Sequence, residues 1–217
     1  MTAGRLALAL LALAWASAQA AERVGAAIVF AVDVSGSVDD ERHALQRAGI
    51  AAIFLEPGIE QIVGDGLATT LMEWSDGHQV VVPWRVLRTA ADARAFAEQV
   101  TAAPRSPGVS TELSLALYAA ADLLDRCGCE TANRIIDISG DGQNNGPVST
   151  WIARDLVLAR GVRINGLPIV TPAEPDLAEW YRANVVGGPG SFIEVAQGFQ
   201  DFARAMRRKF MREVAAR

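Results

Sequence analysis

The chain reads AAIVFAVDVSGS from residue 26 to residue 37, and this stretch is the strongest indication of its fold. Its first seven residues are apolar and rich in β-branched side chains, which is typical of a strand covered on both faces in a parallel sheet. A turn follows, in which Gly36 allows the backbone to fold tightly. The turn carries three side chains that we interpret as oxygen ligands for a divalent cation: Asp33, Ser35 and Ser37.

An alternative interpretation of the same stretch has Ser37 capping the helix that follows. Asp40 stands three residues later, where it would complete a capping box. On this stretch alone, the helix cap and the cation site remain equally good interpretations.

Length and composition favour one exported domain. The chain has 217 residues, of which 51% are hydrophobic, enough for one sizeable domain over residues 21–217. Residues 1–20 combine one arginine, an apolar core and a small-residue cleavage site, which predicts a secretory signal peptide. Its apolar core is too short to cross a bilayer. We therefore expect a periplasmic or secreted protein without a transmembrane segment, and the net charge of −5 disfavours a nucleic-acid partner.

The chain has two cysteines, Cys127 and Cys129, separated by one glycine. In an oxidising compartment this spacing favours a local disulfide at a helix end. Two ligands this close are too few for a closed zinc site.

Strand-like and helix-like segments alternate along the chain. The apolar patterns predict strands at 26–32, 67–74, 78–84, 134–139, 162–170 and 191–195. Helices are expected at 39–56, 89–101, 111–126, 149–160, 176–184 and from 199 onward. The turn Ser75-Asp76-Gly77 predicts a hairpin, and Pro83 places its second strand at an edge. The pattern predicts an α/β fold: a three-layer, doubly wound, mostly parallel six-stranded sheet with one antiparallel edge strand.

Two further oxygen-bearing residues occupy strand-to-helix connections. Thr111 follows a proline-rich loop at a helix start, and Asp141 lies between two glycines after the strand 134–139. In such sheets ligands bind beyond the carboxyl ends of the strands, so we expect these residues to join Asp33, Ser35 and Ser37. Five oxygens without histidine or cysteine select Mg²⁺, with Mn²⁺ and Ca²⁺ as alternatives.

The combined pattern resembles the von Willebrand factor type A domain with its metal ion-dependent adhesion site. The resemblance rests on D-V-S-G-S at 33–37, T-E-L-S-L-A-L at 111–117 and S-G-D-G at 139–142, and it covers about residues 24–214. The motifs V-D-V-S-G-S-V-D and I-D-I-S-G-D-G-Q-N-N also look like a branch of small exported bacterial proteins of this kind. Gly140 departs from the family pattern, in which threonine commonly precedes the aspartate.

The resemblance implies a Rossmann-like fold and an exported, cation-dependent protein-binding module. It implies that Ser35, Ser37 and Thr111 bind the metal directly, and that Asp33 and Asp141 bind it directly or through water. A partner's Asp or Glu carboxylate would complete the coordination.

The alternative function is a phosphatase-like, metal-dependent hydrolase with Asp33 as nucleophile. Such enzymes usually carry a second aspartate two residues later, where this chain has Ser35, and neither G-x-S-x-G nor a phosphate-binding G-x-x-x-x-G-K is present. We expect His43 and His78 to be solvated rather than catalytic bases, and we expect no enzyme.

Two secondary expectations concern residues around the site. Asp137 lies mid-strand and should be buried with a hydrogen-bonding or charged partner. Asn144 and Asn145 border the site, where shaping a turn is favoured over contacting the partner.

Overall fold

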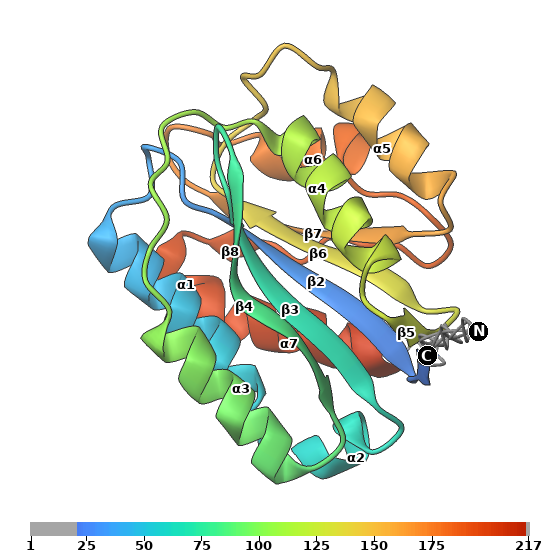
Figure 1. Ribbon diagram of the computed structural model, residues 1–217. Coiled ribbons are helices and arrows are strands. Elements are labelled where there is room, and N and C mark those ends of the chain that lie inside the picture. Colours follow the sequence, from blue (N-terminus) through green and yellow to red (C-terminus); the bar gives the residue numbers. More distant parts are fainter. Residues whose placement is uncertain (1–20, 216–217) are drawn as a thin grey trace, which may run out of the picture.

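The structure is a computed structural model that describes residues 21–215, so the expected signal peptide at 1–20 lies outside the described residues. A six-stranded sheet runs through its centre in the order β4-β3-β2-β6-β7-β8 (Figure 1). Only β3 and β4 pair antiparallel, and β4 is an edge strand, so the predicted fold class is confirmed. The strands are β2 (Ala26–Asp33), β3 (Leu67–Trp74), β4 (His78–Leu87), β6 (Arg134–Gly140), β7 (Arg163–Val170) and β8 (Ala196–Gln197).

Helices cover both faces of the sheet (Figure 1). One layer contains α1 (Asp40–Ile53), α2 (Ile59–Val63), α3 (Ala90–Ala102) and α7 (Phe202–Ala215), which follows the 3-10 turn η1 (Phe199–Asp201). The other layer contains α4 (Leu113–Asp125), α5 (Thr150–Leu158) and α6 (Leu177–Asn184). A separate short parallel pair joins β1 (Glu22–Arg23) to β5 (Cys129–Glu130).

Strand β2 forms the middle of both hydrophobic layers. All eight of its residues are buried, and their side chains alternate between the two faces. Ile28 and Phe30 pack toward α1, α3 and α7, whereas Ala27 and Val29 pack toward α4. The continuous apolar run therefore reflects a strand with neighbours on both edges and helices on both faces.

Several expected boundaries are wrong. The helix expected at 39–56 ends at Ile53, and a separate turn of helix, α2, begins after Gly58, whose φ is 84°. The strand expected at 191–195 is displaced to β8, because the Phe192 N–H donates to the Asn165 side chain instead of joining a regular ladder. Its backbone pairs with β7 through an isolated bridge between Gly166 and Ile193.

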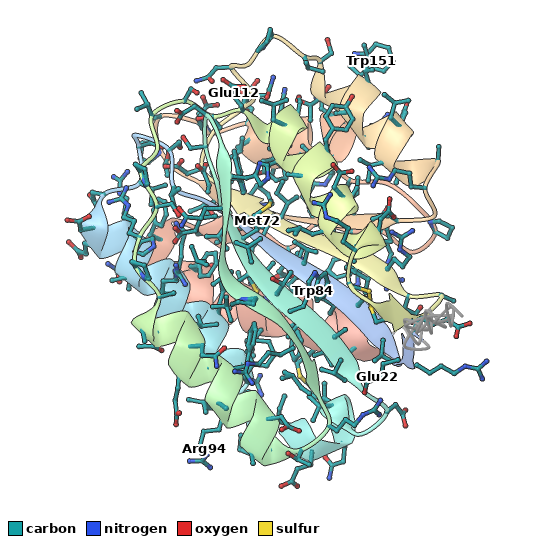
Figure 2. All side chains as sticks on the ribbon, viewed as in Figure 1. Glu22, Met72, Trp84, Arg94, Glu112 and Trp151 are labelled. Carbon is teal, nitrogen blue, oxygen red and sulfur yellow. A yellow bond between two sulfur atoms is a disulfide. The ribbon has the colours of Figure 1, made fainter. Side chains whose placement is uncertain are left out.

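The disulfide expected between Cys127 and Cys129 is present, directly after the end of α4. Figure 2 shows Glu22, near this bridge, at the opposite end of the molecule from Glu112 and Trp151. The bridge therefore lies far from the carboxyl ends of the strands.

A buried charged cluster fixes α7 to the sheet. Lys209 Nζ lies 2.6 Å from Asp137 Oδ2 and 2.7 Å from Glu213 Oε1, and the three residues are at most 1% exposed. Asn165 of β7 donates to the same Glu213 oxygen at 2.8 Å. The expectation that Asp137 is buried with a partner is confirmed. Burial, reinforced by the nearby Glu213 carboxylate, raises the pKa of Asp137 to about 8.

We predict that Lys209→Met destabilises the protein strongly, because the substitution leaves two buried carboxyl groups without their cation. The expected loss in the free energy of unfolding is about 3–5 kcal/mol, measured by urea denaturation at pH 7. Arg204→Met on the same helix is the control, because the Arg204 side chain is 73% exposed and its loss should change stability little. Equal effects of the two variants would contradict a structural role for the buried cluster.

Candidate functional site

The turn after β2 is organised around Asp33. Its Oδ1 accepts a hydrogen bond from the Ser35 backbone N–H at 2.8 Å, and the Ser35 and Ser37 hydroxyl oxygens lie 3.3 Å apart. Gly36 is required for close approach, because a Cβ there would lie 3.1 Å from the Val109 carbonyl oxygen of the neighbouring loop. Helix α1 is capped by Asp39, which accepts from the Arg42 N–H at 2.8 Å. The alternative in which Ser37 caps this helix is therefore wrong.

Ser37 instead contacts the loop that follows β6. Its hydroxyl donates to Asp141 Oδ1 at 2.6 Å, across 104 positions of sequence. Strands β2 and β6 are parallel neighbours, so their carboxyl ends lie at the same edge of the sheet. This pairing places the first and third predicted segments side by side.

Thr111 shares an open cleft of about 720 Å³ with Ser37 and Asp141. Its N–H donates to Asn145 Oδ1, and its carbonyl accepts from the Asn145 N–H, both at 2.9 Å. Asn144 Oδ1 accepts from the Ser114 N–H at 3.2 Å. The two asparagines thus join the loop after β6 to the start of α4 and hold the backbone at the edge of the cleft.

Both carboxylates of the site are buried: Asp33 is 0% exposed and Asp141 is 5% exposed. Asp33 is fully buried, and burial is the main reason that its pKa is raised to about 7; hydrogen bonds from Ser35 oppose this rise and the charge of Asp141 adds to it. Burial, followed by the charges of Asp33 and Asp141, also raises the pKa of Tyr181 well above its usual value. An ionised Asp33 beside Asp141 therefore needs a positive partner.

The residues present fit a divalent cation. They offer two carboxylates and three hydroxyls, the oxygen donors that Mg²⁺, Mn²⁺ and Ca²⁺ prefer. One oxygen of the buried Asp33 carboxyl, Oδ2, has no hydrogen-bond partner among residues 21–215. Within the same described range, no group of three or more His, Cys, Asp or Glu side chains is suited to a metal, so this mixed site is the candidate.

Arg42 is a neighbour of the site that the sequence pattern did not indicate. Its Nη1 donates to the Ser37 carbonyl at 2.5 Å and lies 3.9 Å from Asp141 Oδ2. Its guanidinium also lies over the Phe199 ring, 5.2 Å from the centroid. Arg42 therefore places a positive charge at the rim of the cleft.

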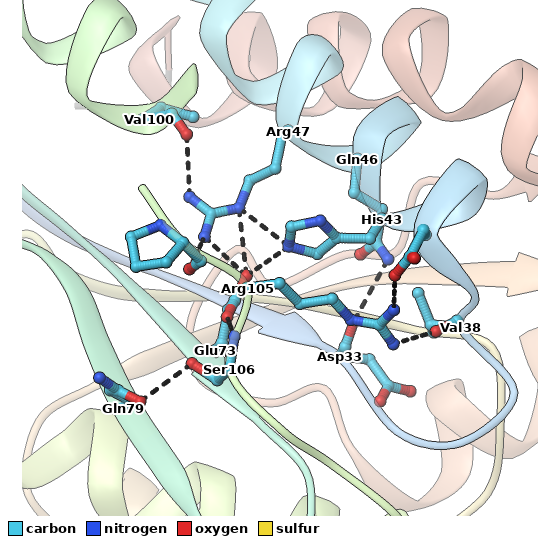
Figure 3. Close-up of polar contacts among 12 residues, drawn as sticks. Asp33, Val38, His43, Gln46, Arg47, Glu73, Gln79, Val100, Arg105 and Ser106 are labelled. Atoms are coloured by element: carbon cyan, nitrogen blue, oxygen red, sulfur yellow. Dashed lines mark hydrogen bonds and ion pairs between the residues drawn. The ribbon is translucent and has the colours of Figure 1, made fainter. Parts of the chain in front are cut away.

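A second buried network holds the loop that leads to Thr111 (Figure 3). Glu73 Oε1 accepts from Arg47 Nη2 at 2.6 Å, and Glu73 Oε2 accepts from the Ser106 N–H at 2.7 Å. Arg47 also donates to the Val100 carbonyl at the end of α3. On the same loop, Arg105 pairs with Asp40 at 2.5 Å at the start of α1.

The two histidines differ in their surroundings. His43 Nε2 lies 2.6 Å from Glu73 Oε1, and its side chain is only 12% exposed. The expectation that His43 is solvated is therefore wrong, because the helix face that carries it packs on the buried end of β3. His78 is exposed in the hairpin, as expected.

The fold is that of a von Willebrand factor type A domain. A mussel byssus matrix protein, proximal thread matrix protein 1, aligns with a TM-score of 0.67, 15% identity, 88% of this chain and 47% of its own. A form of that protein described as having a zinc-occupied MIDAS motif aligns with a TM-score of 0.65 and 16% identity, over 89% of this chain and 48% of that one.

Two bacterial structures share the fold. The von Willebrand factor type A protein from Catenulispora acidiphila has a TM-score of 0.60 and 17% identity, over 88% of this chain and 43% of that one. The pilus adhesin SpaC from Lactobacillus rhamnosus GG, in its open conformation, has a TM-score of 0.61 and 15% identity, over 89% and 30%. The chain thus spans less than half the length of these proteins.

The family is established by sequence. A family model described as "Protein of unknown function (DUF1194)" matches residues 23–217, so the chain belongs to this family. Comparison with curated protein sequences gives no match.

We predict that Glu73 makes stability depend on acid pH. Burial favours its neutral form, but the contacts from His43, Arg47 and Ser106 outweigh burial and lower its pKa from 4.5 to about 2. Because the pKa is lower in the folded state, the contribution is complete above about pH 5 and is lost as the pH falls toward 2. The shift corresponds to about 3 kcal/mol.

The measurement is urea denaturation of the wild type and Glu73→Gln between pH 7 and pH 2. The variant should be less stable at pH 7 and should lose less stability on acidification. Glu98→Gln, an exposed position on α3, is the control and should follow the wild type. Parallel pH profiles for the wild type and Glu73→Gln would contradict the prediction.

Proposed function

We propose that this protein is an exported, divalent-cation-dependent protein-binding module. Its metal, Mg²⁺ by preference and Mn²⁺ or Ca²⁺ as alternatives, would be held by Asp33, Ser35, Ser37, Thr111 and Asp141. The observation that carries the proposal is the 2.6 Å contact between the Ser37 hydroxyl and Asp141 Oδ1, in a cleft that Thr111 also lines. Ser37, Thr111 and Asp141, which come from three separate connections, line this one cleft, and ligands of such sheets bind at the strand carboxyl ends.

The arrangement gives each ligand a role. Ser37 is exposed and contacts Asp141, so both can reach a metal from the cleft, and Thr111 approaches from the start of α4. Asp33 is buried next to Ser35. Its negative charge would favour a cation in the cleft even if a water molecule lay between the carboxylate and the metal. A bound metal would supply an electrophilic position that accepts a carboxylate oxygen from an Asp or Glu of the partner.

The surface around the site is suited to an extended segment of a partner protein. A second groove of about 710 Å³ adjoins the cleft and shares Arg42, Thr171 and Pro172 with it. A partner whose acidic residue reaches the metal would thus have room to continue along the groove. Val109, which is 79% exposed on the loop beside Gly36, offers an apolar contact at the rim.

The same geometry argues against the hydrolase alternative. The proposed nucleophile, Asp33, is 0% exposed and lies beneath the turn, out of reach of a phosphate ester. Of the two histidines, His43 is engaged by Glu73 and Arg47, and His78 lies on the hairpin. We therefore favour a binding protein over an enzyme.

The descriptions of two similar structures support this proposal. One is described as a pilus adhesin and another as carrying a zinc-occupied MIDAS motif. Export rests on the pattern of residues 1–20, and it remains part of the proposal. In residues 21–215, no helix combines the length and apolar character needed to span a membrane.

The metal assignment predicts binding that depends on Asp141. Calorimetric titration of the purified protein with Mn²⁺ or Mg²⁺ should show one site per chain, and Asp141→Ala should weaken binding at least tenfold by removing a charged ligand. Asp122→Ala is the control, because Asp122 is an aspartate of α4 that pairs with Arg160 away from the cleft. Absence of binding in the wild type, or unchanged binding in Asp141→Ala, would refute the metal site.

The partner assignment predicts metal-dependent capture. Immobilised protein should retain a partner from periplasmic or culture extracts in Mg²⁺, and EDTA should release it. The partner should also be lost with Asp141→Ala and kept with Asp122→Ala. Capture that is indifferent to EDTA and to Asp141→Ala would contradict a partner bound through the metal.

A further inference from the structure

The chain has a single lysine, Lys209, and the fold places it in the core. The sequence contains 20 lysine and arginine residues, and all of them except Lys209 are arginine. Lys209 is 0% exposed, between core residues of α7 such as Met206 and Phe210. Arginine is better suited to a buried ion pair, because its guanidinium is more weakly hydrated and pairs with a carboxylate through two hydrogen bonds. Lysine differs in carrying a primary amine, which becomes a nucleophile when it loses a proton.

The amine of Lys209 lies directly against the carboxyl group of Asp137. Its Nζ is 2.6 Å from Asp137 Oδ2, and the carboxyl carbon Cγ is one covalent bond further. No hydrogen bond of normal geometry reaches either oxygen of Asp137 from residues 21–215, so this short contact is not directed as a hydrogen bond. The amine nitrogen and the carboxyl carbon are therefore neighbours held in place by β6 and α7.

Glu213, one turn further along α7, contacts the same amine. Its Oε1 accepts from Lys209 Nζ at 2.7 Å and from Asn165 Nδ2 at 2.8 Å. The Asn165 side chain is itself fixed, because its Oδ1 accepts from the Phe192 N–H at 3.2 Å. Glu213 is thus oriented to take a proton from the amine and to pass a proton to a leaving oxygen.

The protonation of the cluster suits a reaction between an amine and a carboxylic acid. Burial raises the pKa of Asp137; the charge of Glu213 adds to this rise and the charge of Lys209 opposes it. Asp137 is thus the carboxyl group that holds a proton near neutral pH, and Lys209 and Glu213 form the ion pair. One proton passed from Lys209 to Glu213 along their hydrogen bond leaves an amine beside a carboxylic acid.

We propose that Lys209 and Asp137 join in an intramolecular amide bond after the chain folds. The Lys209 ammonium gives one proton to Glu213, and the freed lone pair of Nζ forms a bond with Cγ of the protonated Asp137. The bond from Cγ to one oxygen then breaks, and this oxygen leaves as water with the Asp137 proton and a second proton from nitrogen, relayed by Glu213. The nitrogen keeps one hydrogen, Glu213 ends protonated, and nothing is oxidised or reduced.

Two features of the fold favour the amide over its hydrolysis. Well-oriented groups in one molecule react with effective concentrations on the order of 10⁵ M or more. All three residues are at most 1% exposed, and the reaction replaces a buried ion pair by uncharged groups, which removes the cost of keeping two charges out of water. The bond would join β6, in the sheet, to α7, and it does not depend on the proposed metal site. The ion pair is the arrangement before the reaction, so Lys209→Met abolishes both.

Acylation of the unfolded full protein with an amine-reactive reagent tests the bond, because Lys209 carries the only side-chain amine. After unfolding in urea, Lys209 should stay unlabelled in the wild type and become labelled in Glu213→Gln, which lacks the proton acceptor. Glu194→Gln is the control: Glu194 pairs with Arg208 of α7 at 2.6 Å, outside the cluster, so its Lys209 should stay unlabelled. Full labelling of Lys209 in the wild type overturns the proposal, whether or not the variants fold.

Peptide mass mapping locates the bond. Trypsin does not cleave after a lysine whose amine is in an amide, so the wild type should yield residues 135–154 joined to residues 209–212. The joined peptides should weigh one water molecule less than their sum. Glu213→Gln should release residues 135–154 as a free peptide of full mass. A free 135–154 peptide from the wild type, at full mass or lighter by one water molecule, overturns the proposal.

Discussion

The carboxyl group of Asp33 is buried at the end of a strand that has no exposed residue, and the candidate site depends on how that burial is compensated. Strand β2 lies between β3 and β6 and is covered on both faces, so water cannot solvate its last side chain. Because β6 is parallel to β2, the same arrangement brings Asp141 to the edge where Asp33 lies. Two acidic groups then share a poorly hydrated place, which is favourable only with a cation or a shared proton.

Two other buried charged clusters lie in the helical layer formed by α1, α3 and α7. Glu73 and Arg47 join β3, α1 and the end of α3, whereas Asp137 and Lys209 join β6 to α7. Buried ion pairs add little net stability compared with well-packed apolar residues, but an unmatched partner is strongly destabilising. These clusters therefore act mainly by holding other segments in place. The Glu73 cluster fixes the loop that leads to Thr111, and the Lys209 cluster fixes α7.

The sequence was sufficient for the fold and for the convergence of the site because both follow from local pattern and parallel topology. The apolar run before Asp33 indicated a central strand, and Ser75-Asp76-Gly77 indicated the hairpin. Parallel strands end at one edge, so Asp33 and Asp141 could be expected to be neighbours.

Features that depend on contacts between residues distant in sequence could not be predicted from local patterns. His43 occupies a helix face that looks polar in sequence, yet that face packs on Glu73. Tyr181 looks like an ordinary residue of an amphipathic helix, and nothing local indicates that its hydroxyl reaches Gly140. The Ser37 hydroxyl donates to Asp141 on a distant loop, whereas Asp39 caps α1.

Charge balance explains why Arg42 belongs to the proposed site although it cannot bind the metal. A divalent cation with Asp33 and Asp141 would be electrically neutral, so a partner carboxylate would leave one excess negative charge in a partly buried place. Arg42, 3.9 Å from Asp141 Oδ2 and at the rim of the cleft, supplies a positive charge where that excess would arise. A site with three neutral hydroxyls, two carboxylates and an adjacent guanidinium is therefore better matched to an anionic ligand than to a neutral one.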